Sequence, residues 1–232
     1  ATPLNLVWWT LPVELSFYLL LPFIGWLAGK VSWRLLLGVS FAITMSWRYW
    51  IFSTAEVDNY LVVLPVLDSL IGTLFTFMLG FSLNFLPDNV DERPQKLGLL
   101  LGVVSLLSLM YWQLRMDSVY WTGHWILVVW PPMVALAMAG IVFHLREPIP
   151  LMGWLSSPVL VWLGHVSFGV YLWHFQVMRA MALLFPDYWS TPSASALALL
   201  VAIPATLILA SLSYYLVERP LMGWGKKKLS AV

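Results

Sequence analysis

Long runs of apolar residues alternate with short polar segments along the whole 232-residue chain. A helix needs about 20 predominantly apolar residues to cross the hydrocarbon core of a bilayer. The pattern therefore predicts an all-α polytopic transmembrane helical bundle of about seven spans. The spans are expected at Leu11–Ala28, Trp33–Phe52, Leu61–Leu86, Leu97–Leu114, Trp125–Phe143, Pro158–Phe185 and Leu197–Val217. The third is long enough to tilt.

Two local features modify this pattern. Pro131 and Pro132 lie inside the fifth predicted helix, and we expect them to kink or break it. Residues 221–232 are predicted to form a basic cytoplasmic tail on a single transmembrane domain that covers residues 1–232.

The composition excludes several classes of protein. Hydrophobic residues make up 61% of the chain and charged residues 10%, and the mean hydropathy is +0.84. A soluble domain is nearer half apolar and a quarter charged, so a soluble enzyme and a disordered segment are excluded. The net charge of +1 lacks the basic surface that binds nucleic acid. Because the chain has no Cys, a disulfide, a thiol nucleophile and a cysteine-bound metal are excluded as well.

Basic residues predict the orientation, because cytoplasmic loops carry an excess of Lys and Arg. Nine of the 12 lie on one side of the predicted bundle, including the three at 226–228, so the C-terminus is expected in the cytoplasm. With seven spans, Ala1 is then extracytoplasmic. The chain opens Ala1-Thr2-Pro3, without Met, and reaches an apolar segment within about ten residues. We therefore expect it to be a piece of a longer protein with further spans upstream.

Ionisable residues within membrane spans are functional candidates, because burying charge in lipid is costly. Most of them fall in the outer half of the predicted bundle, which favours a polar cavity that opens outward. They are Glu14, Arg48, Asp68, Arg115, His174 and Arg179.

Each candidate also has a structural interpretation. Arg48 and Arg115 fit snorkelling residues at the rim of the membrane, and Asp68 and Arg179 fit an ion pair with each other across the bundle. Glu14 is compatible with a charge at the start of a helix, and His174 with a hydrogen-bonded core histidine.

Three segments carry a more specific pattern. Trp9–Tyr18 reads W-T-L-P-V-E-L-S-F-Y and is followed by Pro22 four residues later. Trp162–His174 reads W-L-G-H-V-S-F-G-V-Y-L-W-H, and Tyr214–Pro220 reads Y-Y-L-V-E-R-P. These resemble the segments W-S-L-x-V-E-x-x-F-Y-x-x-x-P, W-L-G-x-x-S-Y-x-x-Y-L-W-H and Y-x-x-x-E-R-P of the membrane-bound acyltransferase 3 family, which includes O-antigen and polysaccharide O-acetylases. Phe168 replaces the usual Tyr of the second segment.

The resemblance, which extends from Trp8 to Trp224, implies a ten-span fold whose first three spans are absent. It implies an integral-membrane O-acyltransferase of the bacterial inner membrane. Such an enzyme moves an acyl group, usually acetyl, from cytoplasmic acyl-CoA to a hydroxyl of an extracytoplasmic polysaccharide or lipid-linked glycan such as lipopolysaccharide. The family's proposed catalytic histidine and its arginine motif lie in the absent spans, so the fragment is expected to be inactive alone.

The candidate residues then take roles as follows. Glu14 and His174 are predicted to be catalytic, with Glu14 orienting a base or holding the sugar and His174 donating to the thioester carbonyl or lining the acyl path. Substrate contacts are predicted for Trp9, Tyr18, Arg48, Asp68, Tyr171, Trp173 and Arg179. Arg219 is the candidate for binding acyl-CoA, which is expected as a co-substrate rather than a bound cofactor. No metal site is expected.

The main alternative is a transporter or flippase for a small molecule or lipid-linked sugar, because intramembrane charges also suit transport pathways. A retinal protein is excluded, since Leu197–Val217 contains no Lys to form a Schiff base. A purely structural membrane subunit would leave the charges of the outer half unexplained.

Overall fold

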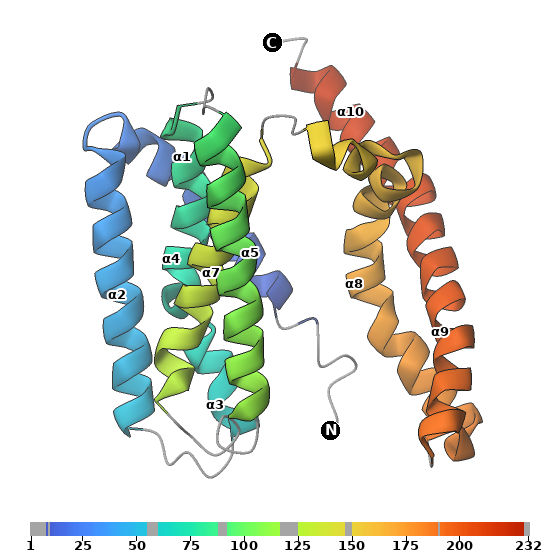
Figure 1. Cartoon of the computed structure of the whole chain (residues 1–232). Coiled ribbons are helices and arrows are strands. Elements are labelled where there is room, and N and C mark those ends of the chain that lie inside the picture. Colours follow the sequence, from blue (N-terminus) through green and yellow to red (C-terminus); the bar gives the residue numbers. More distant parts are fainter. Residues whose placement is uncertain are drawn as a thin grey trace. The chain divides into compact units, whose positions relative to one another are not determined.

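The computed structural model describes residue 8 and residues 10–54, 60–87, 92–116, 125–146, 150–189 and 191–229. All regular structure in these ranges is helical, which confirms the predicted all-α class. The chain divides into two compact units (Figure 1). We name Leu11–Leu151 the α1–α7 unit, and Met152–Val232 together with Ala1–Thr10 the α8–α10 unit.

The α1–α7 unit is built on α2, α4, α5 and α7, which run side by side (Figure 1). Its helices are α1 (Thr10–Ala28), α2 (Trp33–Thr54), α3 (Tyr60–Leu67), α4 (Leu70–Ser82), α5 (Glu92–Arg115) and α7 (Ile126–His144), with a 3-10 turn, η1, at Leu83–Phe85. Ser32 starts α2 by accepting a hydrogen bond from the Leu35 amide. Phe17 of α1 stacks on Phe77 of α4, with ring centroids 4.4 Å apart.

The predicted third span is not one helix. The structure ends α3 at Leu67 and begins α4 at Leu70, so the prediction of a continuous helix over Leu61–Leu86 is wrong. Ser69 has an extended backbone, with φ −60° and ψ 172°, before α4 starts. Gly72 makes this fold possible, because a Cβ there would lie 1.7 Å from the Leu67 carbonyl oxygen. The apolar pattern continues through the break and so could not reveal it.

The double proline in α7 has the opposite outcome. The helix runs unbroken from Ile126 to His144 with Pro131 and Pro132 inside it, so the alternative of a break is wrong. Proline has no amide hydrogen, and each one leaves the carbonyl four residues earlier without its helical donor. These carbonyls belong to Leu127 and Val128.

In the α8–α10 unit, α8 (Pro158–Leu184) packs along α9 (Pro192–Ser213). Thr191 caps α9 by accepting a hydrogen bond from the Ala194 amide. Gly169 allows the two helices to approach closely, because a Cβ there would lie 2.9 Å from the Cα of Ala210. Short 3-10 turns lie at Pro150–Ser156 (η2) and Pro186–Trp189 (η3).

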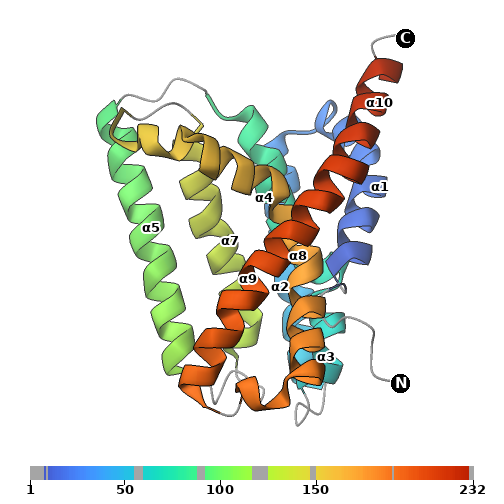
Figure 2. The same ribbon diagram turned by 90° about the vertical axis from the view of Figure 1, so that its right-hand side faces the viewer.

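The last predicted helix, Leu197–Val217, is longer than expected. A π-helical turn, η4 (Tyr214–Glu218), follows α9 and leads directly into α10 (Arg219–Leu229), so that one long rod forms (Figure 2). Residues 221–229 of the predicted tail are therefore helical.

Five helical segments among the described residues are long and apolar enough to cross a membrane. They are Thr10–Ala28, Trp33–Thr54, Arg93–Arg115, Ile126–His144 and Ala194–Trp224. The other two of the seven predicted spans correspond to the broken α3–α4 segment and to α8. The whole arrangement agrees with a polytopic helical bundle.

Candidate functional site

Arg48 of α2 is almost completely buried, with 1% of its surface exposed. Its Nη1 lies 2.6 Å from Oδ1 of Asp68, which stands in the break between α3 and α4. The same nitrogen also donates to the carbonyls of Leu67 and Gly72 on either side of the break. The expectation that Arg48 snorkels to the membrane rim is therefore wrong. The predicted partner of Asp68 is Arg179, whereas the ion pair that the structure shows for Asp68 is with Arg48.

The other side of the Arg48 guanidinium binds α7. Nε donates to the carbonyls of Leu127 and Val128, both at 3.1 Å, and Nη2 donates to Leu127 as well. These are the two carbonyls that Pro131 and Pro132 deprive of a helical donor. Arg48 thus donates to backbone carbonyls at the α3–α4 break and in α7, and it neutralises the carboxylate of Asp68.

We call Arg48, Asp68 and the carbonyls of Leu67, Gly72, Leu127 and Val128 the arginine node. Two further α2 side chains extend it. The Trp47 indole N–H donates to the Val66 carbonyl at 2.9 Å. The hydroxyl of Thr44, 1% exposed, donates to the Ile71 carbonyl and accepts from the Phe75 amide. Substrate binding by Arg48 and Asp68 stays a prediction, and the structure accounts for both side chains without a substrate.

The signal that could have found the node was present in the sequence. Ser40, Thr44 and Arg48 are spaced four residues apart, so they share one face of α2, and all three are buried. Polar residues repeated at helical spacing in an apolar helix must face hydrogen-bond partners inside the bundle. The adjacent Pro131 and Pro132 supply such partners by freeing two carbonyls.

His174 of α8 makes one hydrogen bond with the described residues and lines a cavity. Its Nδ1 lies 3.1 Å from the carbonyl oxygen of Val170, one helical turn earlier. A carbonyl can only accept, so this contact assigns the proton to Nδ1 and makes Nε2 the ring atom available to a substrate. His174 lines a cavity of about 150 Å³ between α8 and α9 with Thr206 and apolar side chains, among them Met178 and Ile203.

Other candidates lie on the same helix. The Tyr171 ring is tilted against that of His174, with centroids 6.0 Å apart. The indole N–H of Trp173 is buried and has no hydrogen-bond acceptor within the part of the chain that the structure describes. An unpaired buried donor is costly, and the predicted substrate contact of Trp173 stays a prediction. Arg179 is exposed near the end of α8.

The first predicted motif falls mainly on α1. Glu14 is half-buried in the second turn and has no hydrogen bond or ion pair with any of the described residues. Its position past the first turn weakens the interpretation as a helix-start charge. Tyr18 is 61% exposed. Trp9 lies outside the described residues. Glu14 belongs to the α1–α7 unit and His174 to the α8–α10 unit.

The third motif forms the π-helical turn and the start of α10. Ser213 donates to the Glu218 carboxylate at 3.3 Å. Arg219 is exposed, with its guanidinium carbon 5.9 Å from the centre of the Tyr215 ring. It is therefore accessible, as the predicted acyl-CoA contact requires, and that role stays a prediction.

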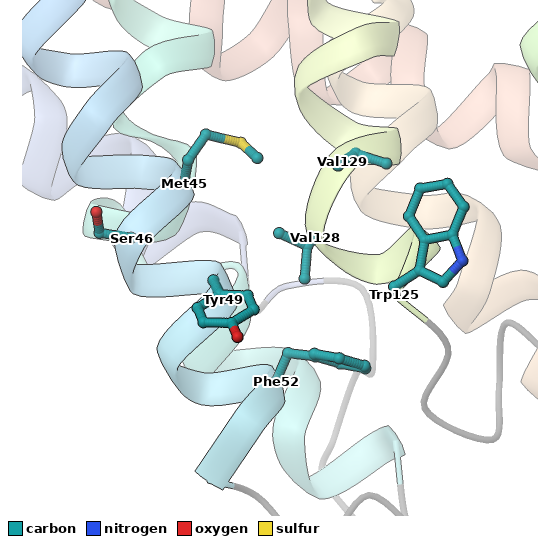
Figure 3. Close-up of a pocket in the computed structure, with 7 residues that line it drawn as sticks. All are labelled: Met45, Ser46, Tyr49, Phe52, Trp125, Val128 and Val129. Carbon is teal, nitrogen blue, oxygen red and sulfur yellow. The ribbon is translucent and has the colours of Figure 1, made fainter.

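A larger cavity of about 460 Å³ lies between α2 and α7 and contains none of the predicted site residues. Figure 3 shows the rings of Tyr49, Phe52 and Trp125 around it. Within the described residues, no group of three His, Asp or Glu side chains could hold a metal ion.

Comparison with known proteins supports the motif assignments. A family model described as an acyltransferase domain matches residues 1–215. Provisionally named O-acetyltransferases from the COL, N315 and MRSA252 strains of Staphylococcus aureus are 25% identical to the chain over 239 aligned residues. The alignments cover 96% of this chain and 37% of each relative, so the chain spans little more than a third of their length. No solved structure matches it. The match to most of the chain, together with the three motifs, shows that the chain belongs to the acyltransferase 3 family.

Proposed function

We propose that this chain forms part of an integral-membrane O-acyltransferase that transfers an acyl group, acetyl in the simplest case, from acyl-CoA to a hydroxyl of an extracytoplasmic glycan. The family match and the O-acetyltransferase names of the relatives support acyl transfer to oxygen. The apolar helices support a membrane location. The distribution of the basic residues favours a cytoplasmic C-terminus, and the bacterial relatives favour the bacterial inner membrane.

The observation that carries the proposal is the hydrogen bond between His174 Nδ1 and the Val170 carbonyl. It leaves Nε2 to act on the substrate. In the neutral ring Nε2 accepts a hydrogen bond, and in the protonated ring it donates one. The predicted donation to the thioester oxygen therefore requires the protonated ring, whereas the neutral ring suits the acceptor hydroxyl.

The proposed reaction transfers the acyl group from the sulfur of CoA to a hydroxyl oxygen of the glycan. The hydroxyl oxygen of the glycan bonds to the acyl carbon while its proton passes to a base, and the carbon–sulfur bond breaks. The thiolate of CoA leaves and takes up a proton. We propose that His174 Nε2 contacts the hydroxyl or the thioester oxygen. We also propose that the carboxylate of Glu14, which has no partner among the described residues, orients the base or holds the sugar. Exposed Arg219 would contact the anionic part of acyl-CoA.

The transporter alternative draws on the break between α3 and α4, because broken helices often form transport sites. In this unit, however, the carbonyls of Val66, Leu67, Ile71 and Gly72 all accept hydrogen bonds from α2 side chains. The break therefore does not present these four acceptors to a solute, and we favour acyl transfer.

Two matched substitutions of His174 in the full-length protein test the proposal. In His174→Asn the amide nitrogen replaces Nδ1 and can keep the bond to Val170, but Nε2 is lost. In His174→Gln the amide instead lies nearer the position of Nε2. We expect His174→Asn to lower glycan acetylation by about 10²- to 10⁴-fold at unchanged membrane abundance, and His174→Gln to retain more activity. Normal acetylation by His174→Asn would contradict the assignment, and solute transport without acyl-CoA consumption would favour the transporter.

A further inference from the structure

Two side chains from the start of the chain form hydrogen bonds with α8. The Thr10 hydroxyl lies 2.5 Å from the Tyr171 hydroxyl. The Trp8 indole N–H donates to the Leu172 carbonyl at 3.3 Å. All four residues belong to the α8–α10 unit, although the two pairs are separated by more than 160 positions in the sequence. Thr10 and Tyr171 belong to two of the three motifs, so their contact joins two motifs directly.

Each hydroxyl lies one helical turn from a candidate catalytic group along its own helix. Thr10 begins α1 and precedes Glu14 by four residues. Tyr171 precedes His174 by three residues in α8, and the two rings are 6.0 Å apart. Residues three or four apart lie on one face of a helix. The Thr10–Tyr171 bond therefore acts on the face of α8 that carries His174.

The contact is more specific than apolar packing requires. Both side chains are half-buried. Valine and phenylalanine have nearly the same shapes as threonine and tyrosine, so a contact made only for packing would not need the two hydroxyls. Each hydroxyl can donate or accept, and losing either one leaves the other without this partner.

We propose that Thr10 and Tyr171 are positioning residues for acyl transfer: their hydrogen bond fixes the Tyr171–His174 face of α8. This assigns Tyr171 a role other than the predicted contact with the substrate. The inference rests on the proposed function. A small displacement of a reacting group can lower a rate by about 10²-fold, so the bond is expected to affect kcat rather than acceptor binding.

A double-mutant cycle in the full-length protein tests this role, with acyl-CoA and the acceptor glycan as substrates. We expect Tyr171→Phe and Thr10→Val each to lower kcat by about 10- to 100-fold, with KM for the acceptor unchanged. The double variant is expected to lose no more than either single variant, because both remove the same bond. Thr10→Ser keeps the hydroxyl and should restore kcat. Tyr49→Phe, at an exposed tyrosine of α2 outside the predicted site, is the control and should leave kcat unchanged.

The outcomes separate the two proposals. Losses that multiply in the double variant, or a failure of Thr10→Ser to restore kcat, would overturn the positioning role while the wild type remains active. A rise in acceptor KM at normal kcat in Tyr171→Phe would overturn it in favour of sugar binding. A wild-type protein that transfers no acyl group would overturn the proposed function and this role with it.

Discussion

The arginine node and the His174 face of α8 both place an ionisable side chain in an apolar helix, but they differ in how its hydrogen bonds are used. In the node, all three guanidinium nitrogens of Arg48 bind acceptors inside the α1–α7 unit. On α8, Nδ1 of His174 binds the Val170 carbonyl, whereas Nε2 of His174 and the N–H of Trp173 have no partner among the described residues.

The difference shows that the position of a charge in a predicted span does not define its role. Arg48 and His174 are both costly to place in lipid. The acceptors around Arg48 offset that cost within the protein, whereas Nε2 of His174 and the N–H of Trp173 have no partner among the described residues. The node therefore has a structural role, and the chemistry that we propose is placed on α8.

The strongest test of this contrast is Arg48→Met. It leaves Asp68 without its counter-ion and the carbonyls of Leu127 and Val128 without donors. Removing one partner of a buried ion pair costs about 3–5 kcal/mol, so we expect most of the protein to be lost from the membrane. Arg115→Met is the matched control, because Arg115 is exposed at the end of α5 and should contribute less than about 1 kcal/mol. Membrane abundance and thermal unfolding in detergent are measured for both variants. Equal stability of Arg48→Met and Arg115→Met would contradict the stabilising role of the arginine node.

The link between Arg48 and the double proline gives a smaller, coupled effect. Replacing Pro131 and Pro132 by Ala returns two amide donors to α7. In the Arg48→Met background we expect this to recover about 1–3 kcal/mol of unfolding free energy, since two acceptors regain partners. Pro204→Ala, in the interior of α9, should recover none of the loss due to Arg48→Met. Recovery of the same size from Pro204→Ala would show that the prolines act through general helix stability instead.

The apolar pattern predicts most of the helices, and the spacing of the buried polar residues of α2 points to the node, but neither identifies the partners of Arg48. The apolar pattern placed the starts of α1 and α2 within one residue, because turns and polar residues flank them. It could not show the break at Asp68, which depends on Gly72 admitting the Leu67 carbonyl and on donors from another helix. It also could not decide whether Pro131 and Pro132 break α7, since that depends on Arg48.

The candidate site divides in a similar way. The motifs identified His174, and its bond to Val170 follows from helical spacing. The contact between Thr10 and Tyr171 joins residues 161 positions apart, and no periodicity predicts such a pair. Sequence patterns report the face of a helix, but they do not report which distant face it meets.

The close packing of α8 against α9 can be tested with two glycines of α8. In Gly169→Ala the new Cβ would lie 2.9 Å from the Cα and the carbonyl oxygen of Ala210, so we expect a loss of about 1–3 kcal/mol. Gly164→Ala meets no atom within 4 Å and should stabilise the helix by about 0.5–1 kcal/mol. Thermal unfolding of both variants measures the difference. A stabilising Gly169→Ala would mean that α8 and α9 are not in close contact.

The smallest expected effect compares the same donor, a tryptophan indole N–H, in the arginine node and on α8. Trp47→Phe removes the indole N–H that binds the Val66 carbonyl and should cost about 1 kcal/mol. Trp173→Phe removes an N–H that has no acceptor among the described residues. Removing an unpaired donor stabilises the fold and should offset the packing lost with the larger ring, so we expect the free energy of unfolding to stay nearly unchanged. If Trp173 serves the substrate, the same variant loses acetylation. A larger loss of stability from Trp173→Phe than from Trp47→Phe would instead mean that the Trp173 N–H makes a structural hydrogen bond. The hydrogen-bonding groups of α8 would then be used within the protein, as those of the arginine node are.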